Sequence, residues 1–192
     1  YAACVNPNLL LSRKKKCYNI TYMKITLLNF CSPRKEYINK DVMGGYGLVT
    51  KVGNSLLAKL ITRQKKKAVN IPVFALGYMA AILSQNGHEV EFQNDMPSKN
   101  SDLVIIPSSI VDCKHEVELA KTIKKQNPRI KIGFFGPFAS VKPEIYLEAA
   151  DFVIRNEPEE IIYKIKEGWI PQGIIESSPV QDLNKLPFPK WE

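Results

Sequence analysis

The sequence predicts an α/β protein with a flavodoxin-like, doubly wound sheet of five parallel strands in the order 2-1-3-4-5. Short apolar runs typical of buried strands alternate with segments of helical periodicity. Several of these runs end in turns that contain proline, glycine or asparagine. With 192 residues, of which 45% are hydrophobic, the chain is long enough for one ordinary core. We therefore expect a single folded domain.

The expected strands and helices follow one another in a regular order. The strands are expected at 24–30, 88–93, 101–107, 129–135 and 151–155. The clearest helix covers 71–87, where Leu76, Met79, Ala80 and Leu83 share one face and Gly87 is a C-terminal cap. Further helices are expected at 113–126, 142–150 and 157–168. Because right-handed crossovers place helices on both faces of a parallel sheet, both faces should be covered.

The two ends of the chain and one internal segment differ from this pattern. Residues 1–22 have no periodicity, and we expect an unfolded leader before a native start at Met23. Residues 23–176 form the expected domain, with a basic insertion at 35–70 that contains the sequence GGYG. Residues 177–192 contain LPFPKW and are expected to be a proline-rich linker that leaves the domain.

Charge and cysteine spacing exclude several classes of protein. The net charge of +8 is concentrated in 1–22 and 34–67, so the rest of the chain is mildly acidic and a solvated basic surface is the favoured interpretation. The four cysteines lack CxxC or CxxxCxxC spacing, which argues against a zinc or iron–sulfur site and indicates free thiols. The sequence has no membrane-spanning run and no secretory signal, so we expect a cytoplasmic protein.

In an open parallel sheet, ligands bind at the carboxyl ends of the strands. The candidate turns are NFCSP, PSSI, GPFAS and NEPEE. They lack GxGxxG and GxxxxGK[ST], an aspartate at a phospho-acceptor position, and a nucleophile–histidine–acid set. His88 and His115 are better explained as surface or capping residues than as catalytic ones. The remaining signal is a set of small and hydroxyl-bearing residues that let a large neutral ligand approach the backbone.

Each of these turns also has a purely structural interpretation. Ser108 and Ser109 can begin a turn, and Gly136-Pro137 can end a strand. Asn156 can cap the helix that follows it, with Glu159 three residues later and Glu157 near the positive end of the helix dipole. These interpretations and ligand binding account for the residues about equally well.

Taken together, the segments LLNFCSP, PVFALGYMAAILSQNGHEVEF, DLVIIPSSI, IGFFGPFASVKPE, ADFVIRNEPEE and DLNKLPFPKW resemble the N-terminal cobalamin-binding domain of cobalamin-dependent radical SAM enzymes. The resemblance covers residues 23–192. The chain departs from the family pattern at two turns: one glycine is missing before Pro137, and Asn156 replaces a glycine. The DxHxxG motif, whose histidine ligates cobalt in other cobalamin proteins, is absent.

The resemblance implies a corrinoid across the carboxyl edge of the sheet, with its nucleotide tail entering between strands. It implies cofactor contacts from Asn29, Ser32, Pro33, Ser108, Ser109, Ile110, Gly136, Pro137, Phe138, Ala139 and Glu157. It assigns no catalytic residue and no metal ligand to this chain. A [4Fe-4S] cluster and S-adenosylmethionine would belong to a C-terminal radical SAM domain, so this fragment should be inactive alone. The full-length protein would be an enzyme of methyl transfer or another radical reaction.

Two alternatives from other classes remain open. One is a nucleotide- or sugar-nucleotide-binding α/β domain of a transferase. The other is a basic module that binds RNA or an acidic protein through residues 34–67, although its lysine runs lack interleaved aromatic residues. We expect nucleic acid not to be the partner.

Overall fold

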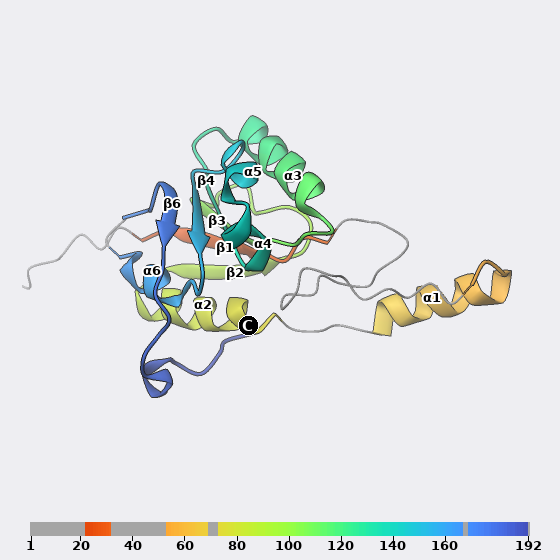
Figure 1. Cartoon of the computed structure of the whole chain (residues 1–192), viewed down its shortest axis with the longest axis horizontal. Helices are drawn as coiled ribbons and strands as arrows, with labels where there is room; N and C mark the ends of the chain where they lie inside the picture. Colours follow the sequence, from red (N-terminus) through yellow and green to blue (C-terminus); the bar gives the residue numbers. More distant parts are fainter. Residues whose placement is uncertain (1–21, 32–52, 69–72, 167–168, 192) are drawn as a thin grey trace, which may run out of the picture.

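The computed structural model of the chain describes residues 22–31, 53–68, 73–166 and 169–191. The predicted leader, apart from Tyr22, and most of the basic insertion lie outside this part of the chain. Within the insertion, residues 56–68 form the helix α1 (Leu56–Ala68), which the sequence analysis did not predict. It lies to one side of the layered body (Figure 1).

The body is built on a parallel sheet of six strands in the order β2-β1-β3-β4-β5-β6. The strands are β1 (Lys24–Leu28), β2 (Glu89–Gln93), β3 (Leu103–Pro107), β4 (Lys131–Phe135), β5 (Phe152–Arg155) and β6 (Gly173–Glu176). The predicted order of the first five strands is confirmed, but the predicted count of five is wrong. The short strand β6 pairs with β5 from Gly173 to Glu176 and is one of the two outer strands of the sheet, the other being β2.

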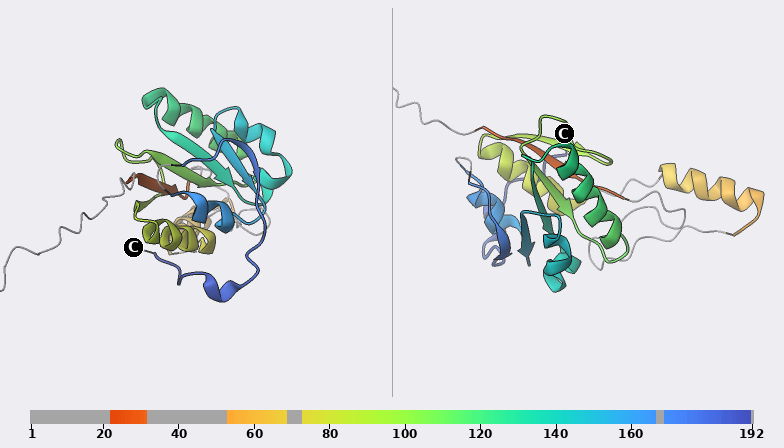
Figure 2. Two further views of the ribbon diagram at one scale, coloured as in Figure 1. Left: turned by 90° about the vertical axis from the view of Figure 1, so that its left-hand side faces the viewer. Right: turned by 90° about the horizontal axis from the view of Figure 1, so that it is seen from above.

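Helices cover both faces of the sheet, as the sequence predicts. The helices α2 (Phe74–Gln85) and α6 (Glu159–Lys164) lie on one face. The other face carries α3 (Cys113–Gln126), α4 (Pro137–Val141) and α5 (Pro143–Leu147). The views in Figures 1 and 2 show this three-layer arrangement.

The apolar core consists of two clusters, one on each face of the sheet, because successive side chains of a strand point to opposite faces. In β3, Leu103 and Ile105 pack with the cluster under α2 and α6, whereas Val104 and Ile106 pack with the cluster under α3. All four side chains are fully buried. This explains why the central strands are continuous apolar runs in the sequence.

Gly133 in β4 is required by a close approach of an aromatic ring. It pairs with Phe152 of β5, and a Cβ atom added to it would lie 2.1 Å from Phe152 Cζ. The ring therefore occupies the space that any larger residue would need. This contact packs the middle of β4 against the first residue of β5.

The C-terminal segment returns to the body. The backbone N–H of Lys190 donates to the Gly77 carbonyl oxygen at 2.9 Å. The Trp191 ring lies over Gly77, where a Cβ atom would be 2.7 Å away, and meets Phe74 edge-on at 5.6 Å between ring centroids. Residues 189–191 of the segment predicted to be a linker thus pack against α2.

The end of α2 also holds the end of α6. The amide nitrogen of Asn86 donates to the Ile165 carbonyl oxygen at 3.1 Å, and His88 Nε2 lies 2.9 Å from the same oxygen. His88 is buried. It therefore caps a helix end, which agrees with the predicted capping role, whereas the alternative of a surface position is wrong for this residue.

Candidate functional site

The carboxyl ends of β4 and β5 carry two turns of unusual backbone conformation. Gly136 follows β4 with φ of 109°, which favours glycine, and Pro137 opens α4. Asn156 follows β5 with φ of 65°, the left-handed region that asparagine tolerates better than most residues. Both turns thus have the positive φ that glycine adopts most easily.

The Asn156 side chain binds the end of β6, and not the start of α6. Its amide nitrogen donates to Glu176 Oε2 and to the Ser177 carbonyl oxygen, each at 3.3 Å. The residue that precedes α6 is Pro158, and its side chain makes no capping hydrogen bond. The interpretation of Asn156 as a helix cap is therefore wrong.

Ser140, near the end of α4, joins the two turns. Its hydroxyl donates to the Gly136 carbonyl oxygen at 2.9 Å and accepts from the Asn156 N–H at 2.9 Å. Arg155 Nε in turn donates to the Ser140 carbonyl oxygen at 2.8 Å. One small side chain thus fixes the spacing of the β4 and β5 turns.

An open pocket of about 550 Å³ lies between these turns and the start of α2. Its apolar lining comes from Ala75, Phe135, Gly136, Pro137, Pro158 and Pro179. Its polar lining comes from Ser140, Asn156, Glu157 and Glu159. None of these described lining residues is basic. The pocket therefore suits an uncharged ligand better than a phosphorylated one.

The glutamates near the pocket differ in their electrostatics. Burial, and to a smaller extent the neighbouring Glu157, raise the pKa of the Glu159 carboxyl above its ordinary value. Its Oε2 atom is buried without a hydrogen-bond partner among the described residues. The ion pair with Lys164, followed by the Ser178 N–H, lowers the pKa of Glu160. Glu160 thus anchors the segment after β6, while Glu159 carries an unsatisfied polar atom beside the pocket.

The turn after β3 is buried and bonded within the protein. The Ser108 hydroxyl accepts from the Ala139 N–H at 2.9 Å. The Ser109 hydroxyl accepts from the Asp112 N–H at 3.1 Å, which is the hydrogen bond of a serine turn. Ser108 and Ser109 are 2% and 0% exposed, so both side chains serve the fold in this structure.

Tyr146 of α5 and Glu116 of α3 lie beneath that turn. Glu116 accepts from the Ser109 N–H at 3.1 and 3.2 Å through its two carboxylate oxygens, and from the Tyr146 hydroxyl at 2.8 Å. Burial, followed by the charge of Glu116 and this hydrogen bond, raises the pKa of the Tyr146 phenol far above its ordinary value. Tyr146 therefore remains a hydrogen-bond donor.

The other predicted site residues are distributed along the same edge. The Asn29 N–H donates to the Gln93 carbonyl oxygen at 2.8 Å and continues the pairing of β1 with β2. Ile110 is exposed. Ala139 is buried beside Ser108, and the Phe138 ring meets Tyr146 edge-on at 6.2 Å. Ser32 and Pro33 lie outside the described residues.

The structure therefore brings three of the predicted residues together in the pocket: Gly136, Pro137 and Glu157. Ser140, Asn156 and Glu159 belong to the candidate turns GPFAS and NEPEE but are not among the cofactor contacts predicted by residue, and Ala75 and Pro179 lie outside those turns. Ser140 lies four residues after Gly136, a helical spacing that could have indicated a contact with the turn. Ala75 and Pro179 carry no comparable local signal, because they reach the pocket from distant parts of the chain.

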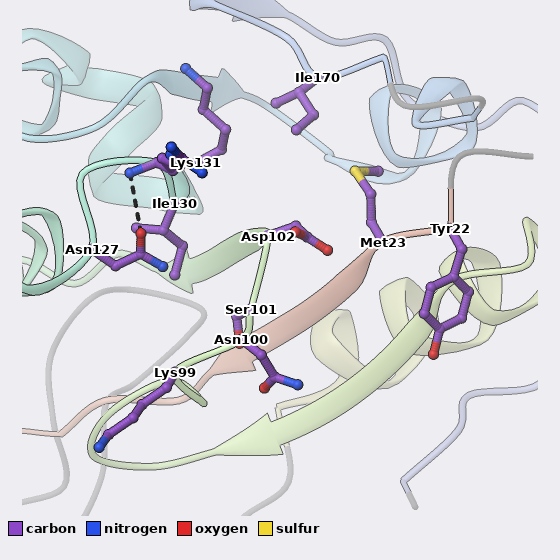
Figure 3. A pocket seen from close by; sticks show the side chains of 11 residues that line it. Tyr22, Met23, Lys99, Asn100, Ser101, Asp102, Asn127, Ile130, Lys131 and Ile170 are labelled. Atoms are coloured by element: carbon purple, nitrogen blue, oxygen red, sulfur yellow. Dashed lines mark hydrogen bonds between the residues drawn. The ribbon is translucent and has the colours of Figure 1, made fainter.

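A second pocket, of about 390 Å³, lies at the opposite, amino end of the sheet (Figure 3). Its lining is more polar and includes Lys99, Asn100, Asp102, Asn127 and Lys131. The Arg129 N–H donates to Asn127 Oδ1 at 3.2 Å within this lining. The sequence predicts no site here.

The part of the chain that the structure describes contains no group of three or more histidine, cysteine, aspartate or glutamate side chains placed to hold a metal ion. Among the described helices, none has the length and apolar character needed to cross a bilayer. No protein-family model matches the chain, and no curated protein matches it significantly.

Proposed function

We propose that this chain is the cobalamin-binding domain of a cobalamin-dependent radical SAM protein. The observation that carries the proposal is the apolar pocket that the β4 and β5 turns form at the carboxyl edge. The motif resemblance assigns the corrinoid to this edge, and parallel α/β sheets bind their ligands there.

The lining of the pocket fits the corrin ring better than it fits a nucleotide. The periphery of the ring carries neutral amide side chains, which suit a surface of proline, alanine and glycine with few polar atoms. A nucleotide needs hydrogen-bond donors or cations for its phosphates, but the described lining of this pocket has no basic side chain and contains the carboxyl groups of Glu157 and Glu159. The nucleotide-binding alternative is therefore the weaker one.

The chemistry would come from the cofactor, which when bound supplies a methyl group or assists a radical step. This chain would bind the ring through Gly136, Pro137 and the residues around them, and would keep the ring oriented. The described residues that line the pocket include no histidine, so they offer no imidazole ligand to cobalt. The [4Fe-4S] cluster and S-adenosylmethionine would belong to another domain of the full-length protein.

A titration of the purified chain with hydroxocobalamin, followed by visible absorbance and calorimetry, tests the proposal. We expect saturable binding that Ala75→Phe weakens by about tenfold or more, because the added ring fills the pocket. Val141→Phe is the control, since Val141 is 69% exposed on α4 and is not among the residues that line the pocket. Absence of binding, or binding of UDP-sugars or ATP instead, would contradict the proposal.

A further inference from the structure

The turns after β3 and β4 are closed against each other, although the resemblance implies a nucleotide tail that enters between strands at this edge and cofactor contacts from both turns. We infer that this domain binds its corrinoid through the ring alone and leaves the nucleotide tail outside the space between these turns. The inference rests on the proposed function and specifies which part of the ligand is recognised.

The pairing of β3 with β4 continues to the edge of the sheet. The N–H of Ser108, the residue after β3, donates to the carbonyl oxygen of Phe135, the last residue of β4, at 2.7 Å. A Cβ atom added to Gly136 would lie 3.1 Å from Ser108 Oγ and 3.5 Å from the Ser108 backbone N and O. Ser108 therefore already fills the space beside the Gly136 backbone, where other residues would carry a side chain.

The layer under these turns is also filled. Tyr146 is fully buried, and its ring packs on Phe134 with centroids 4.5 Å apart. Its hydroxyl donates to Glu116, which also accepts from the Ser109 N–H. A dimethylbenzimidazole group that entered here would displace this ring and remove the Tyr146 donor from the buried Glu116 carboxylate, and both changes oppose binding.

The open pocket lies on the other side of Gly136. Its lining includes Gly136, Pro137 and Ser140, whereas Ser108 and Ser109 do not belong to it. A ligand at the carboxyl edge thus finds an open pocket for the ring on one side of Gly136, and closely packed side chains on the other side. The two parts of cobalamin should therefore contribute unequally to its affinity.

The experiment compares hydroxocobalamin with aquocobinamide, which has the same ring and lacks the nucleotide tail, on the wild-type chain and on Ser108→Ala. We expect the two dissociation constants to agree within about twofold in both proteins. Ser108→Ala should lower the melting temperature, because the buried Ala139 N–H loses its acceptor. If the variant fails to fold, the comparison on the wild-type chain still decides the question.

A preference of the wild-type chain for cobalamin by about tenfold or more would overturn the inference. Loss of that preference in Ser108→Ala would further place the tail between the two turns. If neither corrinoid binds, the proposed function and the inference are both overturned. If both corrinoids bind but cobalamin binds more tightly by that factor, the inference is overturned and the proposed function stands.

Discussion

The two ends of the parallel sheet are built from different interactions. At the amino end, Asp151 pairs with Lys124 and Lys131 and accepts from the Ile132 N–H at 2.8 Å. At the carboxyl edge, the hydroxyl groups of Ser108 and Ser140 hold the turns after β3, β4 and β5. Ion pairs with one aspartate thus fix the amino end, whereas serine hydroxyls space the turns around the pocket, beside the ion pair of Arg155 with Glu176. The described linings also differ, because the pocket at the amino end includes Lys99 and Lys131 whereas the carboxyl-edge pocket includes no basic residue.

The strand β4 links the two ends, and its glycine gives the largest effect that we predict. Gly133→Ala should lower the free energy of unfolding by about 3 kcal/mol or more, because the added methyl group would overlap the buried Phe152 ring. Chemical denaturation followed by circular dichroism measures the change.

Gly173→Ala is the matched control for this substitution. Gly173 has φ of +73°, but a Cβ atom there would meet nothing within 4 Å. The expected cost is about 1 kcal/mol, from backbone strain alone. Equal losses in the two variants would show that Phe152 does not exclude a side chain at position 133.

The charged cluster at the amino end gives the next largest effect. Asp151→Asn should cost about 2 kcal/mol, because two lysines and a backbone N–H lose a charged acceptor that is itself only 15% exposed. Glu148→Gln removes one partner of the exposed pair with Lys121 and should cost less than about 0.5 kcal/mol. Urea denaturation at neutral pH compares the two variants.

The same cluster predicts a pH dependence. Burial alone would raise the pKa of Asp151, but hydrogen bonds from Lys124, Lys131 and the Ile132 N–H outweigh it and hold the pKa below its ordinary value of 3.8. The contribution of Asp151 to stability is therefore present above that value and is lost as the pH falls through the lower pKa of the folded state. The difference between wild type and Asp151→Asn should shrink below about pH 4. A constant difference down to pH 2 would contradict this assignment.

The first five strands and the helices α2 and α3 were predictable, because their apolar residues follow the periods that burial imposes. The strand β6 has only four residues, which alternate between exposed and half-buried, so it gave no continuous apolar run. Likewise, α1 leaves Leu56, Leu57 and Leu60 exposed, so its pattern is not tied to this core.

Prediction of the site was limited by contacts between distant segments. Glycine adopts positive φ more easily than other residues, so Gly136 after a predicted strand was compatible with such a turn, and the structure has one there. The role of Ser140 depends on the distance between two turns that lie 20 residues apart in the chain, which is set by the pairing of β4 with β5. The Trp191 ring can pack on α2 because Gly77 has no side chain there. The sequence around Gly77 does not indicate that Trp191 is the residue that packs on it.

The last prediction compares the same substitution, serine to alanine, at the carboxyl edge and near the amino end of the sheet. Ser140→Ala and Ser98→Ala each remove a partly buried hydroxyl that makes hydrogen bonds at 2.9 Å, in the first case to Gly136 and Asn156 and in the second to Glu91. Each should cost about 1 kcal/mol of stability. Only Ser140→Ala should also weaken hydroxocobalamin binding, by about threefold to tenfold, because it alone loosens the two turns that line the carboxyl-edge pocket. Thermal melts and calorimetric titrations of the two variants, made side by side, measure both quantities. If the two variants lost binding equally, the ligand would depend on the stability of the whole fold, and the distinction between the ends of the sheet would have no functional meaning.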